Sequence, residues 1–79
     1  MDEREKDFLA LVARIIAFLR DHNQHCYTAE ELAAKEKIKR GADVTTERMT
    51  EICELLSREG IIDPKREDKG RCYQAVRLA

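Results

Sequence analysis

The chain is poor in the residues on which several classes of protein depend. Its 79 residues include no tryptophan, one proline, three glycines and three cysteines. No apolar run reaches the roughly 18 residues of a membrane-spanning helix, and the acidic, polar start is unlike a signal peptide. The cysteines are odd in number and far apart, which argues against a disulfide framework and for a reducing compartment. We therefore expect a soluble cytoplasmic protein with free thiols that does not contact a membrane.

Features typical of enzymes are also missing. The sequence has no glycine-rich phosphate loop and no serine-centred elbow, and its one serine is Ser57. A chain of this size buries only about 60% of the surface that its unfolded form exposes, so an internal active-site cleft is not expected. We predict a single domain over residues 1–79 that is not an enzyme and binds no cofactor.

The first part of the chain predicts a helix with a wide apolar side. Acidic side chains in residues 2–7 suit the N-terminal end of a helix, and two apolar stripes of helical spacing follow. The pattern fades near residues 22–25. A side this wide indicates either a central place in the chain's own core or a contact with another molecule. We favour a homodimer, with an interface formed by Phe8, Leu9, Val12, Ile16 and Leu19.

A second helix is predicted by a capping box. The hydroxyl of Thr28 can accept a hydrogen bond from the amide of Glu31, while the carboxylate of Glu31 accepts from the amide of Thr28. Leu32, Ala33 and Ile38 give this helix a thin apolar face. Gly41 offers a stop.

A third helix is predicted over about residues 45–59. Asp43 or Thr45 can cap its start, and Gly60 supplies the left-handed residue at which a helix can end. Spacings of four and three place one set of side chains on its inward face. These inward residues are Met49, Cys53 and Leu56.

After Gly60 the apolar pattern changes from helical to extended. An isoleucine pair begins a strand that Pro64 confines to the edge of a sheet. Residues 71–78 alternate between two unlike sets of side chains, the period-two pattern of a strand with two different faces. We expect a β-hairpin with a basic tip over about residues 63–78.

One local group of side chains has the chemistry of metal ligands. His22, His25 and Cys26 are close in sequence, and Cys72 could join them from the hairpin. The spacing matches no standard zinc pattern, so we interpret these residues as a polar linker and predict no metal site. A metal or redox sensor is the alternative. Cys53, on the inward face of its helix, is interpreted as a small core residue.

Taken together, the patterns resemble the winged helix-turn-helix proteins of the MarR-like and ArsR-like kind found in bacteria and archaea. The resemblance covers about residues 8–78 and implies a mostly α fold with a small β-hairpin, in which three helices precede a two-stranded wing. It departs from the family over residues 35–43, a longer connection than the tight turn of a simple helix-turn-helix. The residues on which it rests are the apolar repeat of the first helix, Thr28-Ala29-Glu30-Glu31-Leu32-Ala33, Val44-Thr45, Met49, Cys53, Leu56, Gly60 and Ile61-Ile62.

The resemblance implies sequence-directed binding to double-stranded DNA in transcriptional regulation. The helix over residues 45–59 would enter the major groove, and the wing would contact phosphates. Residues 35–48 include five basic and three acidic side chains, and residues 65–77 include five basic and two acidic ones. This local excess of positive charge favours a polyanionic partner. The residues expected at the DNA are Thr28, Lys39, Arg40, Thr46, Arg48, Thr50, Lys65, Arg66, Lys69 and Arg71.

Three acidic residues favour a different partner. Glu47, Glu51 and Glu54 are among the outward positions of the helix expected to enter the groove, where their charge repels phosphates. The alternative function is therefore a winged-helix adaptor that binds another protein, through the apolar first helix or through this acidic face.

Overall fold

In the computed structural model, which describes residues 2–77, the chain begins with the long helix α1 (Glu3–Asp21). Asp2 caps its first turn by accepting a hydrogen bond from the amide of Arg4. The helix ends at His22, whose amide donates to the carbonyl of Phe18. Among the described residues, no helix combines the length and the apolar character needed to cross a bilayer.

The predicted second helix is divided into α2 (Ala29–Ala34) and α3 (Glu36–Lys39). Both halves of the predicted capping box form, and Lys35 then adopts an extended conformation that interrupts the helix. In a continuous helix Leu32 and Ile38 would lie about 120° apart around the axis, because they are six residues apart. The break at Lys35 lets both side chains reach the core, and both are fully buried.

Helix α4 (Thr46–Arg58) matches the predicted third helix closely. The hydroxyl of Thr45 caps its start by accepting from the amide of Arg48. At its end Gly60 has φ +74, and the amide of Ile61 donates to the carbonyl of Leu56 over 2.9 Å. The predicted inward residues are buried, and Ile52 joins them.

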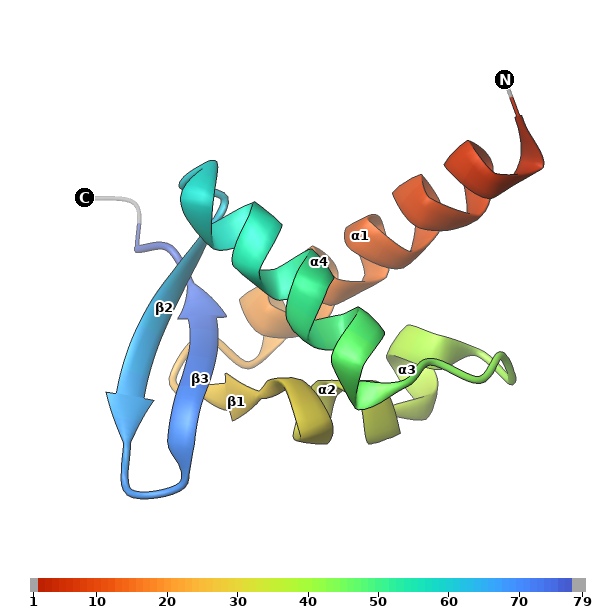
Figure 1. Ribbon diagram of the computed structural model, residues 1–79. Helices are drawn as coiled ribbons and strands as arrows, with labels where there is room; N and C mark the ends of the chain where they lie inside the picture. Colours follow the sequence, from red (N-terminus) through yellow and green to blue (C-terminus); the bar gives the residue numbers. More distant parts are fainter. Residues whose placement is uncertain (1, 78–79) are drawn as a thin grey trace.

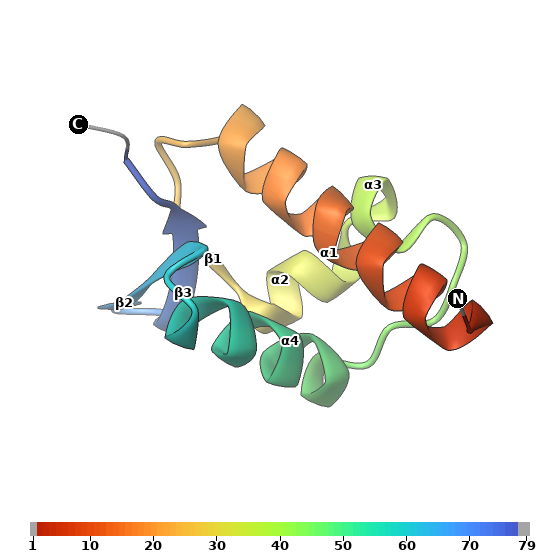
Figure 2. The same ribbon diagram turned by 90° about the horizontal axis from the view of Figure 1, so that it is seen from above.

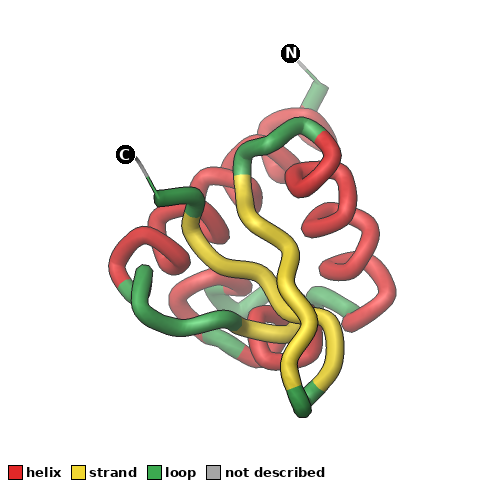
Figure 3. Tube along the Cα trace, turned by 90° about the vertical axis from the view of Figure 1, so that its left-hand side faces the viewer, coloured by secondary structure: helices red, strands yellow, loops and turns green. Residues whose placement is uncertain are grey.

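Three strands form one antiparallel sheet in the order β1-β3-β2. They are β1 (Tyr27–Thr28), β2 (Ile62–Glu67) and β3 (Gly70–Ala75), and Figure 3 shows the β2–β3 hairpin extending beyond the helices. Pro64 lies on the edge strand β2, as predicted. The two-residue strand β1 was not predicted, because it is too short to show a period and its second residue, Thr28, is also the first residue of the capping box.

The two sets of side chains predicted for this strand lie on opposite faces of β3, as expected, but residues 72–75 are all buried. The reason is that β3 is the central strand and both of its faces are covered. Tyr73 and Ala75 belong to the core between the sheet and the helices. On the other face the side-chain amide of Gln74 donates to the carbonyl of Asn23 over 2.7 Å. Leu78, which ends the predicted strand, lies outside the described residues.

The expectation of free thiols is also wrong for two of the three cysteines. Cys26 and Cys72 form a disulfide across a sequence separation of 46, while Cys53 is the free cysteine and is buried. The link arises from strand pairing: Thr28 lies opposite Cys72, so Cys26, two positions earlier, faces the same side of the sheet. In the chain-entropy model a disulfide that closes a loop of this length stabilises the fold by up to about 4 kcal/mol. The pairing removes the cysteine argument for a reducing compartment.

The core lies between the helices and the inner face of the sheet. Seen from above, α1 and α4 run along two sides of the molecule and α2 lies between them (Figure 2). Cys53 is fully buried, which confirms its place as a core residue, and burial raises the pKa of its thiol to about 12. The other fully buried side chains include Ile15, Leu19, Leu32, Ile38, Met49, Ile52, Ile62 and Tyr73.

Candidate nucleic-acid interface

Helix α4 and the hairpin are joined by a group of three polar side chains. Arg71 on β3 donates twice to the carboxylate of Glu54 on α4, from Nε over 2.7 Å and from Nη2 over 3.0 Å. The hydroxyl of Tyr73 donates to the same carboxylate. The hydrogen bonds from Arg71 lower the pKa of Glu54, while burial raises the pKa of Tyr73 to about 12. Arg71, expected at the DNA, is therefore paired within the chain.

The outer side of α4 is acidic. The residues that lie opposite its buried stripe follow one another at spacings of four, three and four, so they form a row along the helix. A polyanion that approached α4 directly would meet this row first. Its members are Glu47, Glu51, Glu54 and Arg58.

Of the three α4 residues expected at the DNA, Thr46, Arg48 and Thr50, the last two have side chains engaged with neighbours. The guanidinium of Arg48 lies 5.7 Å from the centre of the Phe8 ring on α1, and its Nη1 is 3.3 Å from the carboxylate of Glu51. Arg48 thus lies against α1. The hydroxyl of Thr50 donates to the carbonyl of Thr46 over 2.8 Å. All of these α4 residues are exposed and can change partners.

The hairpin divides its basic residues between its two faces. Arg66 lies opposite Arg71, so both are on the face that meets α4. Lys65 lies opposite Cys72, on the outer face, where its ammonium group donates to the side chain of Gln74 over 2.8 Å. Within residues 2–77 the side chain of Arg66 has no hydrogen bond or ion pair. Arg66 is therefore the hairpin residue most available to a phosphate.

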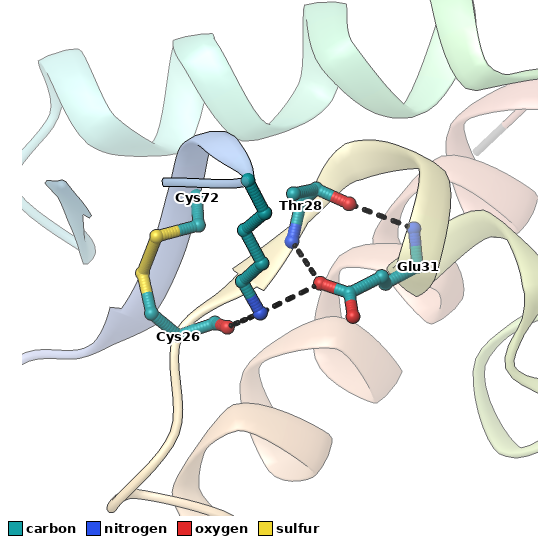
Figure 4. A network of polar contacts seen from close by, with 5 residues as sticks. Cys26, Thr28, Glu31 and Cys72 are labelled. Carbon is teal, nitrogen blue, oxygen red and sulfur yellow. Dashed lines mark hydrogen bonds and ion pairs between the residues drawn. A yellow bond between two sulfur atoms is a disulfide. The ribbon is translucent and has the colours of Figure 1, made fainter. Parts of the chain in front are cut away.

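Lys69, at the hairpin turn, folds back onto the start of α2. Its ammonium group is 2.9 Å from the carboxylate of Glu31 and also donates to the carbonyl of Cys26. Glu31 in turn accepts from the amide of Thr28 over 2.8 Å, and Figure 4 shows this network beside the disulfide. The amide of Thr28 and then Lys69 lower the pKa of Glu31. The structure thus uses both Thr28 and Lys69, which were expected at the DNA, inside the chain.

The two predicted residues at the end of α3, Lys39 and the C-cap Arg40, lie apart from the hairpin. Figure 1 shows α3 and the hairpin at opposite ends of α2. The ammonium group of Lys39 is 4.0 Å from the carboxylate of Glu36, and Arg40 follows in a left-handed conformation with φ 48. Arg40 lines a shallow hollow between α1 and α3 together with Arg14. The structure therefore does not bring Lys39 and Arg40 to the α4–hairpin surface.

The predicted dimer interface on α1 needs one correction. Leu19 is fully buried in the chain's own core, so in this conformation it offers no surface to a second copy. Phe8 and Val12 are partly buried and pack against the same core. Leu9 is 50% exposed, and Ile16 lines a shallow apolar hollow beside the strands. The wide apolar side of α1 is thus largely used within the chain.

The group of possible metal ligands differs from the one that the sequence suggested. The ring of His22 stacks on Phe18 with 4.3 Å between ring centres, and its Nδ1 lies 2.9 Å from the carbonyl of Phe18. The two sulfurs of Cys26 and Cys72 instead lie within 4.8 Å of a carboxylate oxygen of Glu67. Sequence spacing could not identify Glu67, because only the pairing of β2 with β3 brings it near Cys72.

Comparison with known proteins supplies no relative from which a function can be transferred. The resemblance to winged helix-turn-helix proteins therefore stays a prediction from the residues. No family model, curated protein or solved structure matches the chain.

Proposed function

We propose that the chain is a winged-helix domain that binds double-stranded DNA as a transcriptional regulator, with the β2–β3 hairpin supplying most of the phosphate contacts. The observation that supports this best is the position of the hairpin, which extends past the helices and lies beside α4 (Figures 1 and 3). Such a pair of elements can contact one groove and the adjacent backbone together. The short strand β1 pairs with the central strand β3, which is compatible with a winged-helix fold.

The charge of the hairpin suits a phosphate backbone. Between residues 65 and 71 it has four basic and two acidic side chains. Arg66 and Lys65 are exposed, and the ion pairs of Arg71 and Lys69 are also at the surface. Exposed ion pairs stabilise a fold only weakly, so these cations can exchange a carboxylate for a phosphate.

Helix α4 has a smaller part in this proposal. Thr46, Arg48 and Thr50 are the side chains that could contact base edges or phosphates near its start. The acidic row on its outer side opposes close approach. We therefore expect binding that is weak and strongly reduced by salt, because phosphate contacts dominate it.

The test is a titration of duplex DNA at two salt concentrations. Replacing Lys65 and Arg66 together by glutamine should weaken binding to every sequence and reduce its salt dependence by about two contacts, roughly 0.9 log units each. The control is Arg4→Gln with Lys6→Gln, which removes the same charge from the first turns of α1. Figure 1 shows the start of α1 far from the hairpin. Equal losses in both double variants would mean that only total charge matters, and absence of binding at low salt would reject the proposal.

The acidic row of α4 favours a second candidate, an adaptor that binds a protein with a basic surface. The carboxylates of Glu47 and Glu51 are exposed and point away from the core. Under the DNA proposal, replacing both by glutamine removes repulsion and strengthens nonspecific binding. If the wild type and this variant both fail to bind DNA at low salt, the adaptor is the function that remains.

A further inference from the structure

We propose that Cys26, Cys72 and Glu67 form a binding site for a thiophilic divalent cation such as Zn²⁺ when the Cys26–Cys72 disulfide is reduced. The two sulfurs and a carboxylate oxygen of Glu67 all lie within 4.8 Å of one another. This inference goes beyond the proposed function and does not depend on DNA binding.

Strand pairing places the three ligands on one face of the sheet. Cys72 lies opposite Thr28 on one side and Lys65 on the other, and Cys26 and Glu67 are each two residues away from these partners. Side chains two positions apart on a strand share a face. Glu67 ends β2, Cys72 lies on β3 and Cys26 directly precedes β1. The pairing of the three strands therefore sets the position of the site.

The ligand set and spacing suit zinc. Thiolate and carboxylate are both common zinc ligands, and Zn–S distances of about 2.3 Å in a tetrahedral site place two sulfurs about 3.8 Å apart. The Cα atoms of the two cysteines are 5.4 Å apart, so rotation of the side chains can open this space without moving the strands. Glu67 is exposed, which leaves the fourth position open to solvent.

Metal binding and the disulfide exclude each other, because both use the same two sulfurs. A dithiol reductant transfers two electrons and two protons to the disulfide, giving two thiols while the reductant forms its own disulfide. A divalent cation then displaces two protons from the thiols. Two thiolates and one carboxylate leave the occupied site with a charge of −1, which the ammonium group of Lys69, bonded to the carbonyl of Cys26, can offset.

The test uses Cd²⁺ as the probe, because its bonds to thiolates absorb in the ultraviolet. The full chain is reduced with a dithiol, the reductant is removed without oxygen, and Cd²⁺ is added. We expect one ion per reduced chain and no absorption from the oxidised chain. Cys53→Ala, which removes the buried third thiol, should retain the signal.

Glu67→Gln tests the third ligand in a variant that can still form the disulfide. Loss of a ligand should weaken Cd²⁺ binding at least about tenfold, since even partners of ligands have effects of this size. Asp68→Asn, which removes the same charge at the next position, should keep wild-type affinity. No absorption from the reduced wild type, loss of the signal in Cys53→Ala, or equal affinities of Glu67→Gln and Asp68→Asn would each overturn the proposal.

Discussion

At the scale of single residues, two glutamates bind two of the basic side chains of the hairpin, Arg71 and Lys69. Glu54 accepts from Arg71 and Tyr73, and Glu31 accepts from Lys69 while it completes the cap of α2. Basic residues that look available to DNA in the sequence are therefore partly neutralised by acids far away in the chain. The local excess of positive charge over residues 65–77 overstates the charge that a partner meets.

These two carboxyls predict how stability depends on pH. Both pKa values are lowered from 4.5, that of Glu54 first by Arg71 and that of Glu31 first by the amide of Thr28. A carboxyl with a lower pKa in the folded chain stabilises the fold above its unfolded pKa and loses this effect as the pH falls through its folded pKa. We therefore expect the free energy of unfolding, measured with urea, to fall as the pH drops below 4.5.

The variant Glu31→Gln should weaken that pH dependence, because the amide does not titrate in this range. Its control is Glu30→Gln, which removes an equal charge from the preceding, exposed position. The control should retain the wild-type slope of unfolding free energy against pH. Identical slopes for the two variants would show that the network of Thr28, Glu31 and Lys69 is not formed in solution.

At the scale of elements, local signals place the ends of the helices. Thr28 and Thr45 each accept from an amide three residues later, and Gly60 allows the chain to leave α4. The interruption at Lys35 has no comparable signal. It follows from the need to bury both Leu32 and Ile38, and it explains why a connection longer than a simple turn joins α2 to α4.

The end of α4 gives a prediction about Gly60. A Cβ at this position would meet no atom within 4 Å, so any cost of Gly60→Ala comes from the left-handed backbone, φ +74. We expect a loss of roughly 1–2 kcal/mol in the free energy of unfolding. Gly60→Asn should lose less, because asparagine tolerates this conformation better. Equal stability of the alanine variant and the wild type would show that α4 does not end at Gly60 in this way.

At the scale of the whole molecule, Leu9 and Leu19 of α1 separate dimer formation from folding. Leu9 is 50% exposed, whereas Leu19 has no exposed surface. If α1 forms a homodimer, the mass in solution at micromolar concentration should be that of a dimer. Leu9→Glu should then give monomers with nearly unchanged unfolding free energy, because an exposed carboxylate stays hydrated.

Leu19→Glu should instead unfold the chain, because it places an unpaired charge in the core. Sedimentation for the mass and circular dichroism for the fold distinguish these results. A wild type that is monomeric at high concentration would show that the apolar side of α1 serves only the chain's own core.

The sequence by itself determined the features whose partners are a few residues apart. The capping box of α2, the cap at Thr45, the buried stripe of α4, the stop at Gly60 and the edge position of Pro64 were all predictable. Each depends on hydrogen bonds within one turn, on a regular repeat or on the backbone of a single residue. Such effects are present wherever the same short segment occurs.

Only the tertiary structure decided which distant residues meet. Strand β1, the Cys26–Cys72 disulfide, the position of Glu67 beside it and the pairing of Glu54 with Arg71 join parts of the chain that no local repeat relates. The same holds for Leu19, whose apolar character suits an interface or a core equally well. The physical reason is that these contacts exist only after the helices have packed on the sheet, where burial and strand register bring the side chains together.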